Sequence, residues 1–169
     1  MLKLPGAYGV KERKKGECHM IRTLSAVVMI VLAVSVAIAQ QDPIAARKAL
    51  MKENADQAKI GAAMAKGEAP FDLAKARKIF ARFENTAVKA PALFPENSID
   101  EATADDPYSA SPDIWKNMDD FKARLAKFGS DSKAADANVK DLDSFKAAFG
   151  EIGKNDCGGC HEKYRLKKS

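Results

Sequence analysis

Residues 111–128 read SPDIWKNMDDFKARLAKF, and their apolar spacing sets the expected class of fold. The stretch opens with Ser111, a favoured helix N-cap. A proline suited to the first helical turn follows, and then an acid that complements the positive helix N-terminus. Apolar residues then recur at steps of four and three, namely Ile114, Met118, Phe121, Leu125 and Phe128. Such a seam is typical of near-antiparallel packing between long helices.

Three further segments carry helical periodicity, and no segment has the alternation of a strand. The first runs from about Pro43 to Lys66 and carries a stripe of mostly small residues, which lets a neighbouring helix approach closely. The second runs from about Phe71 to Lys89, and the last from about Asp141 to the tail. The acidic connection from Pro95 to Ser111 indicates an exposed loop. We therefore expect an all-α protein, an antiparallel four-helix bundle.

The chain begins with a different composition. A basic stretch is followed by an almost uninterrupted apolar run over residues 24–38, which closes on Ala37-Ile38-Ala39. This layout is typical of a secretory signal peptide, and the run is shorter than the roughly 20 apolar residues of a membrane-spanning helix. We therefore expect residues 1–39 to be a presequence with a signal peptide cleaved after Ala39. The stretch before Met20 is either a long n-region or an upstream start that is not used, and we favour the second reading, with translation from Met20. Residues 40–169 then form one domain, exported to the periplasm.

Most of the net positive charge of the chain lies in that presequence. The net charge is +5, but residues 1–39 hold six Lys or Arg against two Asp or Glu, so the exported domain is nearly neutral. A neutral domain lacks the basic character of a nucleic-acid-binding protein. After cleavage no apolar span is left to anchor it in a membrane.

Near the end of the chain stands Cys157-Gly158-Gly159-Cys160-His161, the C-x-x-C-H signature for covalent attachment of haem c. On a helix the three reactive side chains project from one face, because they are three and four positions apart. A zinc site needs more Cys or His ligands than the exported domain contains, and a disulfide between such close cysteines would be strained. A thioredoxin-type dithiol lacks its usual βαβ context. We expect one haem c per chain, anchored by Cys157 and Cys160, with His161 on the iron.

A second protein ligand to the iron must come from upstream, since only eight residues follow His161 and none is Met or His. The exported domain offers Met51, Met64 and Met118. Met118 lies in the apolar seam and Met64 near the end of the first helix, where both are expected in the core. Met51 lies in the first third of its helix, which in an antiparallel bundle can face the last third of the fourth helix. Met51 is the best candidate, although a methionine on an apolar stripe is more often a core residue.

From Gln40 to its end, the chain resembles the cytochrome c′ family of class II c-type cytochromes. The segments LMKEN at residues 50–54 and YSASP at residues 108–112 are most similar to the low-spin cytochrome c-556 branch. Besides these and the C-x-x-C-H motif, the resemblance rests on residues 47–54, 66–72, 93–95, 111–115 and 146–150.

The resemblance implies roles for individual residues. In the low-spin branch the methionine matching Met51 binds iron opposite the histidine. Arg47 matches an arginine that contacts a haem propionate in the high-spin branch, and Phe94 matches an aromatic residue in the distal pocket of the family. By residue type alone, these two would be a solvated charge and a core aromatic. Arg165 matches a residue beside the proximal haem face. Family members often form homodimers through their first two helices, which the alanine stripe permits.

We therefore predict a periplasmic monohaem electron carrier that exchanges electrons with another protein of that compartment. Thioether and imidazole ligands together favour the reduced iron, which suits this role. The alternative is a five-coordinate, high-spin cytochrome c′ that binds nitric oxide or carbon monoxide. We predict no enzyme and no catalytic residue, because the motif is accompanied by no second histidine and no paired acid and base.

Overall fold

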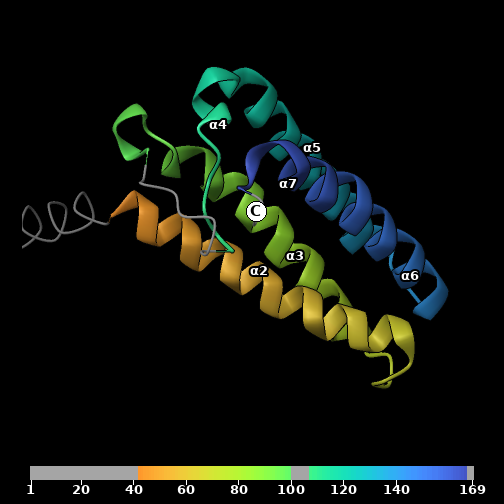
Figure 1. Cartoon of the computed structure of the whole chain (residues 1–169). Coiled ribbons are helices and arrows are strands. Elements are labelled where there is room, and N and C mark those ends of the chain that lie inside the picture. The colour runs from red at the N-terminus through yellow and green to blue at the C-terminus, as the bar shows by residue number, and fades with distance from the viewer. Residues whose placement is uncertain (1–41, 100–106, 167–169) are drawn as a thin grey trace, which may run out of the picture. The chain divides into compact units, whose positions relative to one another are not determined.

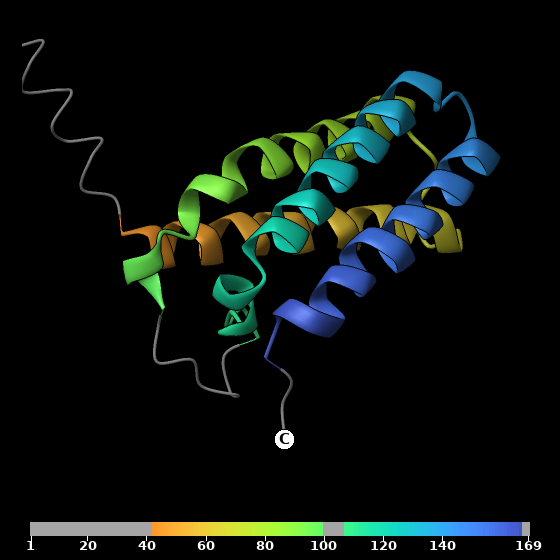
Figure 2. The ribbon, with the colours of Figure 1, turned by 90° about the horizontal axis from the view of Figure 1, so that it is seen from above.

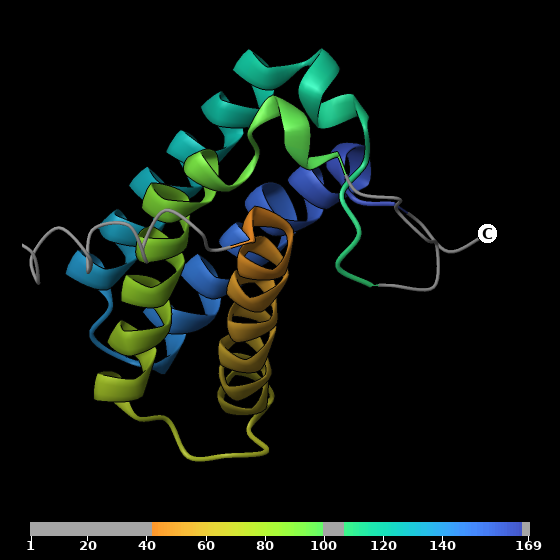
Figure 3. The ribbon, with the colours of Figure 1, turned by 90° about the vertical axis from the view of Figure 1, so that its left-hand side faces the viewer.

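Helices of alternating direction make up the part of the chain that this computed structural model describes, residues 42–99 and 107–166 (Figure 1). They form four columns, and Figures 2 and 3 show the arrangement from two further sides. The predicted all-α, antiparallel four-helix bundle is confirmed. The first three columns are α2 (Pro43–Lys66), α3 (Leu73–Lys89) and α5 (Met118–Asn138); the fourth joins α6 (Leu142–Glu151), a π-helical stretch (Ile152–Gly158) and α7 (Gly159–Tyr164).

The expected presequence, residues 1–39, lies outside the described residues, together with the start at Met20 and the cleavage point after Ala39. None of the helices in the described part is long and apolar enough to cross a bilayer.

Short-range capping sets the ends of α2 and α3. The Asp42 carboxylate accepts a hydrogen bond from the Ile44 amide at 2.9 Å, and α2 ends at Gly67, whose φ of 78° is left-handed. The bounds predicted for this helix are confirmed. α3 begins at Leu73, two residues later than predicted, because the Asp72 side chain caps it by accepting from the Lys75 amide at 3.0 Å.

The sequence suggested one helix over residues 111–128, but the structure divides this segment in two. It breaks at Asn117, whose φ and ψ of −133° and 43° separate a short α4 (Asp113–Lys116) from α5. The Asn117 side-chain amide donates to the Asp113 carbonyl at 3.0 Å, which gives the backbone a local alternative to helix. The seam still packs as expected, because Ile114 and Phe121 are both buried on either side of the break.

The connection before α4 was predicted to be an exposed loop, and this is wrong for several of its described residues. Ser98, Ser109 and Ala110 are buried. The Ser111 amide donates to the Tyr164 carbonyl at 2.9 Å, and the Leu166 amide donates to Ser109 at 3.1 Å. An isolated antiparallel bridge thus connects the loop before α4 to the chain beyond α7, although the described residues contain no strand.

The buried side chains form two clusters rather than one core. The first lies between α2, α3, α5 and α6, and its centre is Phe145, with ring centroids 5.6 Å from Phe80 and 5.2 Å from Phe149. Here α2 approaches closely, because a Cβ on Gly61 would lie 2.5 Å from the Phe149 ring. Met64 packs in this cluster, as predicted. The second cluster comprises Leu50, Ala90, Phe94, Ala110, Ile114, Phe121, Leu125 and Tyr164.

Phe145→Ala should lower the unfolding free energy of the haem-loaded protein by about 3–5 kcal/mol, because it removes a fully buried ring from a packed cluster. Urea unfolding followed by far-ultraviolet circular dichroism measures the change. Val88→Ala is the matched control, since Val88 is 75% exposed and its truncation should change the free energy by less than about 0.5 kcal/mol. Equal losses in the two variants would contradict the packing described here.

Candidate functional site

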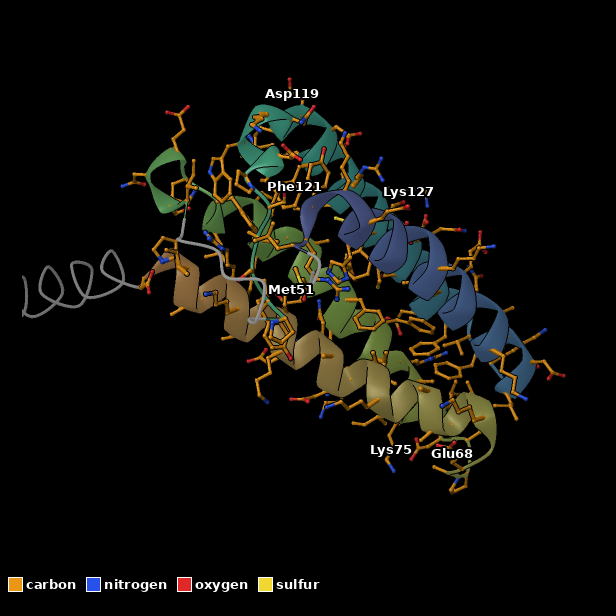
Figure 4. All side chains as sticks on the ribbon, viewed as in Figure 1. Met51, Glu68, Lys75, Asp119, Phe121 and Lys127 are labelled. Atoms are coloured by element: carbon orange, nitrogen blue, oxygen red, sulfur yellow. The ribbon has the colours of Figure 1, made fainter. Side chains whose placement is uncertain are left out.

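A cavity is lined by side chains from both apolar clusters. Phe83 and Phe128 belong to the first cluster and Phe121 and Leu125 to the second, and all four line the same space. Figure 4 labels two residues that line it from different columns, Met51 on α2 and Phe121 on α5. The structure brings all the site residues predicted from sequence to this cavity: Arg47, Met51, Phe94, Cys157, Cys160 and His161.

The C-x-x-C-H motif spans the change from π-helix to α-helix. Cys157 lies near the end of the π-helical stretch, while Cys160 and His161 lie in α7, and each is half-buried at the cavity. The wide turn is tightly filled, since a Cβ on Gly158 would lie 3.3 Å from the Gly153 carbonyl oxygen. The π-helical turn was not expected from the sequence, although such turns occur often at functional sites.

Burial keeps the reactive groups of the motif neutral. It raises the pKa of the Cys157 thiol to about 11 and also raises the pKa of Cys160. Burial, together with the positive charge of Arg165, lowers the pKa of His161. A neutral imidazole is the form that binds a metal. Arg165 itself is exposed and lines the same cavity as the histidine, near which it was expected.

One carboxylate fixes the helix that carries the histidine. Asp120, on α5, accepts hydrogen bonds from the Tyr164 hydroxyl at 2.5 Å and from the Lys163 ammonium at 3.1 Å. It also accepts from Arg124 at 2.9 Å, and Arg124 in turn donates to the Gly159 carbonyl at 3.2 Å. These donors hold the pKa of Asp120 well below its usual range. Sequence reasoning missed Asp120, because only its spacing of four from Arg124 is visible in the chain.

Arg47 is buried, not a solvated helix charge, with only 2% of its surface exposed. Its Nη1 atom donates to the Ser98 carbonyl at 2.8 Å and to the Ser98 hydroxyl at 3.0 Å. The guanidinium lies 5.0 Å from the ring centroid of Phe94 and 5.4 Å from that of Trp115, a cation–π arrangement. Phe94 also packs edge-on against Phe121 at 4.8 Å. Phe94 is therefore both a core aromatic and part of the cavity wall.

Several polar lining residues have no signal in the sequence. The Asn54 side-chain oxygen accepts from the Thr86 hydroxyl at 2.8 Å, which orients the amide in the wall. Ser109 is 1% exposed, and its hydroxyl has no hydrogen-bond partner among the described residues. Asp156 is the one carboxylate among the described lining residues. Nothing in residue spacing identifies these three, because each reaches the cavity through the packing of distant helices.

The chemistry of the lining fits a haem. Most of the wall is apolar, as a porphyrin ring requires, and three lining guanidinium groups suit the two propionates of a haem. Two thiols and an imidazole are present for attachment and ligation. No group of three His, Cys, Asp or Glu side chains in the described part of the chain is placed to hold a bare metal ion. The three guanidinium groups belong to Arg47, Arg124 and Arg165.

Comparisons with known proteins agree with this fit. A family model described as cytochrome c′ matches residues 42–165. The chain is 38% identical to a cytochrome c-556 of Rhodopseudomonas palustris, over 88% of this chain and 99% of that protein. It is 40% identical to a cytochrome c′ of the same organism, over 83% of this chain and 93% of that protein. The solved structure of Rhodopseudomonas palustris cytochrome c′ superposes with a TM-score of 0.69 and 39% identity, covering 77% of this chain and all of that one.

Asp120→Asn should destabilise the haem-loaded protein at pH 7 and have progressively less effect below pH 4. The folded-state pKa of Asp120 is depressed, so its contribution to stability is fully present above the unfolded-state pKa of about 3.9. That contribution is lost as the pH falls through the lower folded-state pKa. Unfolding free energies of the two proteins, measured in urea from pH 7 to pH 2.5, test this. Asp119→Asn, at the exposed neighbouring position labelled in Figure 4, is the matched control and should lower the free energy of unfolding at pH 7 by less than Asp120→Asn does.

Proposed function

The chain belongs to the cytochrome c′ family, and on that premise we propose that it is an electron carrier of the periplasm. It is a monohaem c-type cytochrome with one covalently attached haem c, as its family and its C-x-x-C-H motif establish. The haem, when bound, supplies an iron that gains or loses one electron. The proposed role needs no catalytic residue, only ligands that stay in place in both oxidation states.

We assign the axial positions to His161 and Met51, with Cys157 and Cys160 as the covalent anchors. The observation that carries this assignment is the cavity itself: Met51 on α2 and His161 on α7, 110 positions apart in the chain, line the same space. The two other methionines of the described residues support it by their placement. Met64 is 2% exposed in the first cluster, and Met118 packs beside the second cluster without lining the cavity.

We assign Arg47 and Phe94 to the side of the haem that faces Met51. The proposal that Arg47 holds a propionate is supported by its place one helical turn before Met51 and in the lining of the cavity. Phe94 is held against the guanidinium and the Phe121 ring, so it presents a rigid aromatic wall. The resemblance of residues 50–54 to the cytochrome c-556 branch, and the similarity to a cytochrome c-556, favour the six-coordinate state over a gas-binding one.

Another protein of the same compartment is the proposed redox partner. A homodimer stays a prediction from the family, but the alanine stripe no longer supports it. Ala55 and Ala58 line the cavity and Ala65 packs against the first cluster, so the stripe is the inward face of α2.

Met51→Ala should convert the ferric protein from a low-spin to a high-spin absorption spectrum and let the ferrous protein bind carbon monoxide. The reason is that alanine has no sulfur to occupy the sixth position. Met118→Leu is the matched control, since Met118 does not line the cavity, and it should keep the wild-type spectrum. A wild-type protein that is already high-spin and binds carbon monoxide readily would make gas binding the function instead.

The exported protein should begin at Gln40 and carry one haem. Its intact mass, measured after periplasmic extraction from a host that matures c-type cytochromes, should equal residues 40–169 plus a single haem. Material with an uncleaved amino-terminal segment, or colour found only in the membrane fraction, would overturn the proposed localisation.

A further inference from the structure

A buried carboxylate stands in the cavity wall directly before the first haem-anchoring cysteine. The Asp156 side chain is only 2% exposed and lies at the end of the π-helical stretch, next to Cys157. One of its oxygens, Oδ1, accepts from the Lys127 ammonium at 2.9 Å. The other, Oδ2, is buried and has no hydrogen-bond partner among the described residues. Asp156 thus lines the cavity with one carboxylate oxygen paired to Lys127 and one buried oxygen that has no donor among the described residues.

The cation that faces Asp156 compensates it only in part. Lys127 is 60% exposed, lies on α5 (labelled in Figure 4), and also pairs with Asp131. One ammonium therefore serves two carboxylates, and part of its field is screened by water. Arg124, the lining cation on the same helix, is paired with Asp120. Together, Asp156, Lys127 and Asp131 carry a net negative charge. Asp156 is the buried member of this group and lines the cavity.

We propose that Asp156 sets the reduction potential of the haem, its buried negative charge stabilising the oxidised iron and so lowering the potential. A charge inside a protein acts through a lower effective dielectric than water, and it is screened little by salt. The step concerned is the transfer of one electron to Fe(III), giving Fe(II), with no bond made or broken. The proposal requires the covalent haem of the family, but neither ligation by Met51 nor a role as electron carrier.

The test is the potential of the haem-loaded Asp156→Asn variant, measured by spectroelectrochemistry with mediators. Asparagine keeps the shape and can still accept from Lys127, so the substitution removes little but the charge. We expect the equilibrium constant for reduction to rise about tenfold, which is 59 mV for one electron. The potential of Asp156→Glu, which restores the charge, should lie close to that of the wild type.

Two controls separate a charge effect from a structural one. Asp131→Asn removes the acid that shares Lys127 but is 38% exposed, so its effect should be smaller and should fade at high salt. Absorption spectra of all variants report the axial ligands. An Asp156→Asn protein with the wild-type spectrum and an unchanged potential overturns the proposal, whatever its stability. The spectrum of the Met51→Ala variant tests whether Met51 binds the iron. It does not test the effect of the Asp156 charge on the potential.

Should Asp156→Asn fail to retain haem, Lys127→Gln decides the question. Lys127 is largely exposed, and its loss leaves the buried carboxylate without its cation. We expect a lower potential than that of the wild type at pH 9, because the buried carboxylate has lost its compensating cation. An equal or higher potential there overturns the proposal.

Discussion

The four columns are arranged around a space that their own side chains do not fill. A bundle of this length would ordinarily bury one continuous core. Here the apolar residues separate into two clusters, and the cavity takes its lining from both. A haem held in this cavity would border both clusters with its apolar ring, so it would complete the packing of the bundle as well as supply the redox centre.

The last column carries the residues to which we assign the covalent anchors and the proximal ligand. It is held from two sides. Asp120 accepts hydrogen bonds from three donors, two of them on α7. The loop around Ser109 forms backbone hydrogen bonds with the chain at the end of α7 and beyond it. Neither contact touches the imidazole. Together they fix the helix on which His161 lies, which is how the fold can keep a metal ligand in place without burying it fully.

The charges at the cavity are unequal in their burial. Arg47 lies almost wholly inside, against two aromatic rings, whereas Arg165 is exposed. The one described carboxylate of the wall, Asp156, is also buried, with a cation that reaches it from the surface. A buried charge acts on its surroundings through a lower effective dielectric than an exposed one, so burial distinguishes Arg47 and Asp156 from Arg165. Net charge, nearly zero for residues 40–169, carries none of this information.

The sequence alone determined what depends on neighbours within a few positions: the helical periods, the start of α2 at Pro43, and the C-x-x-C-H motif. It misjudged the chain at Asn117, where a side-chain hydrogen bond competes with the helix, and in the loop of polar residues that the tail buries. Only the tertiary structure decided that Met51 lines one cavity with the motif, that Arg47 is buried and that Asp156 borders the cavity. Those facts arise from contacts between residues tens of positions apart. Local patterns record which side chains a helix presents, but the packing of one helix on another decides what they meet.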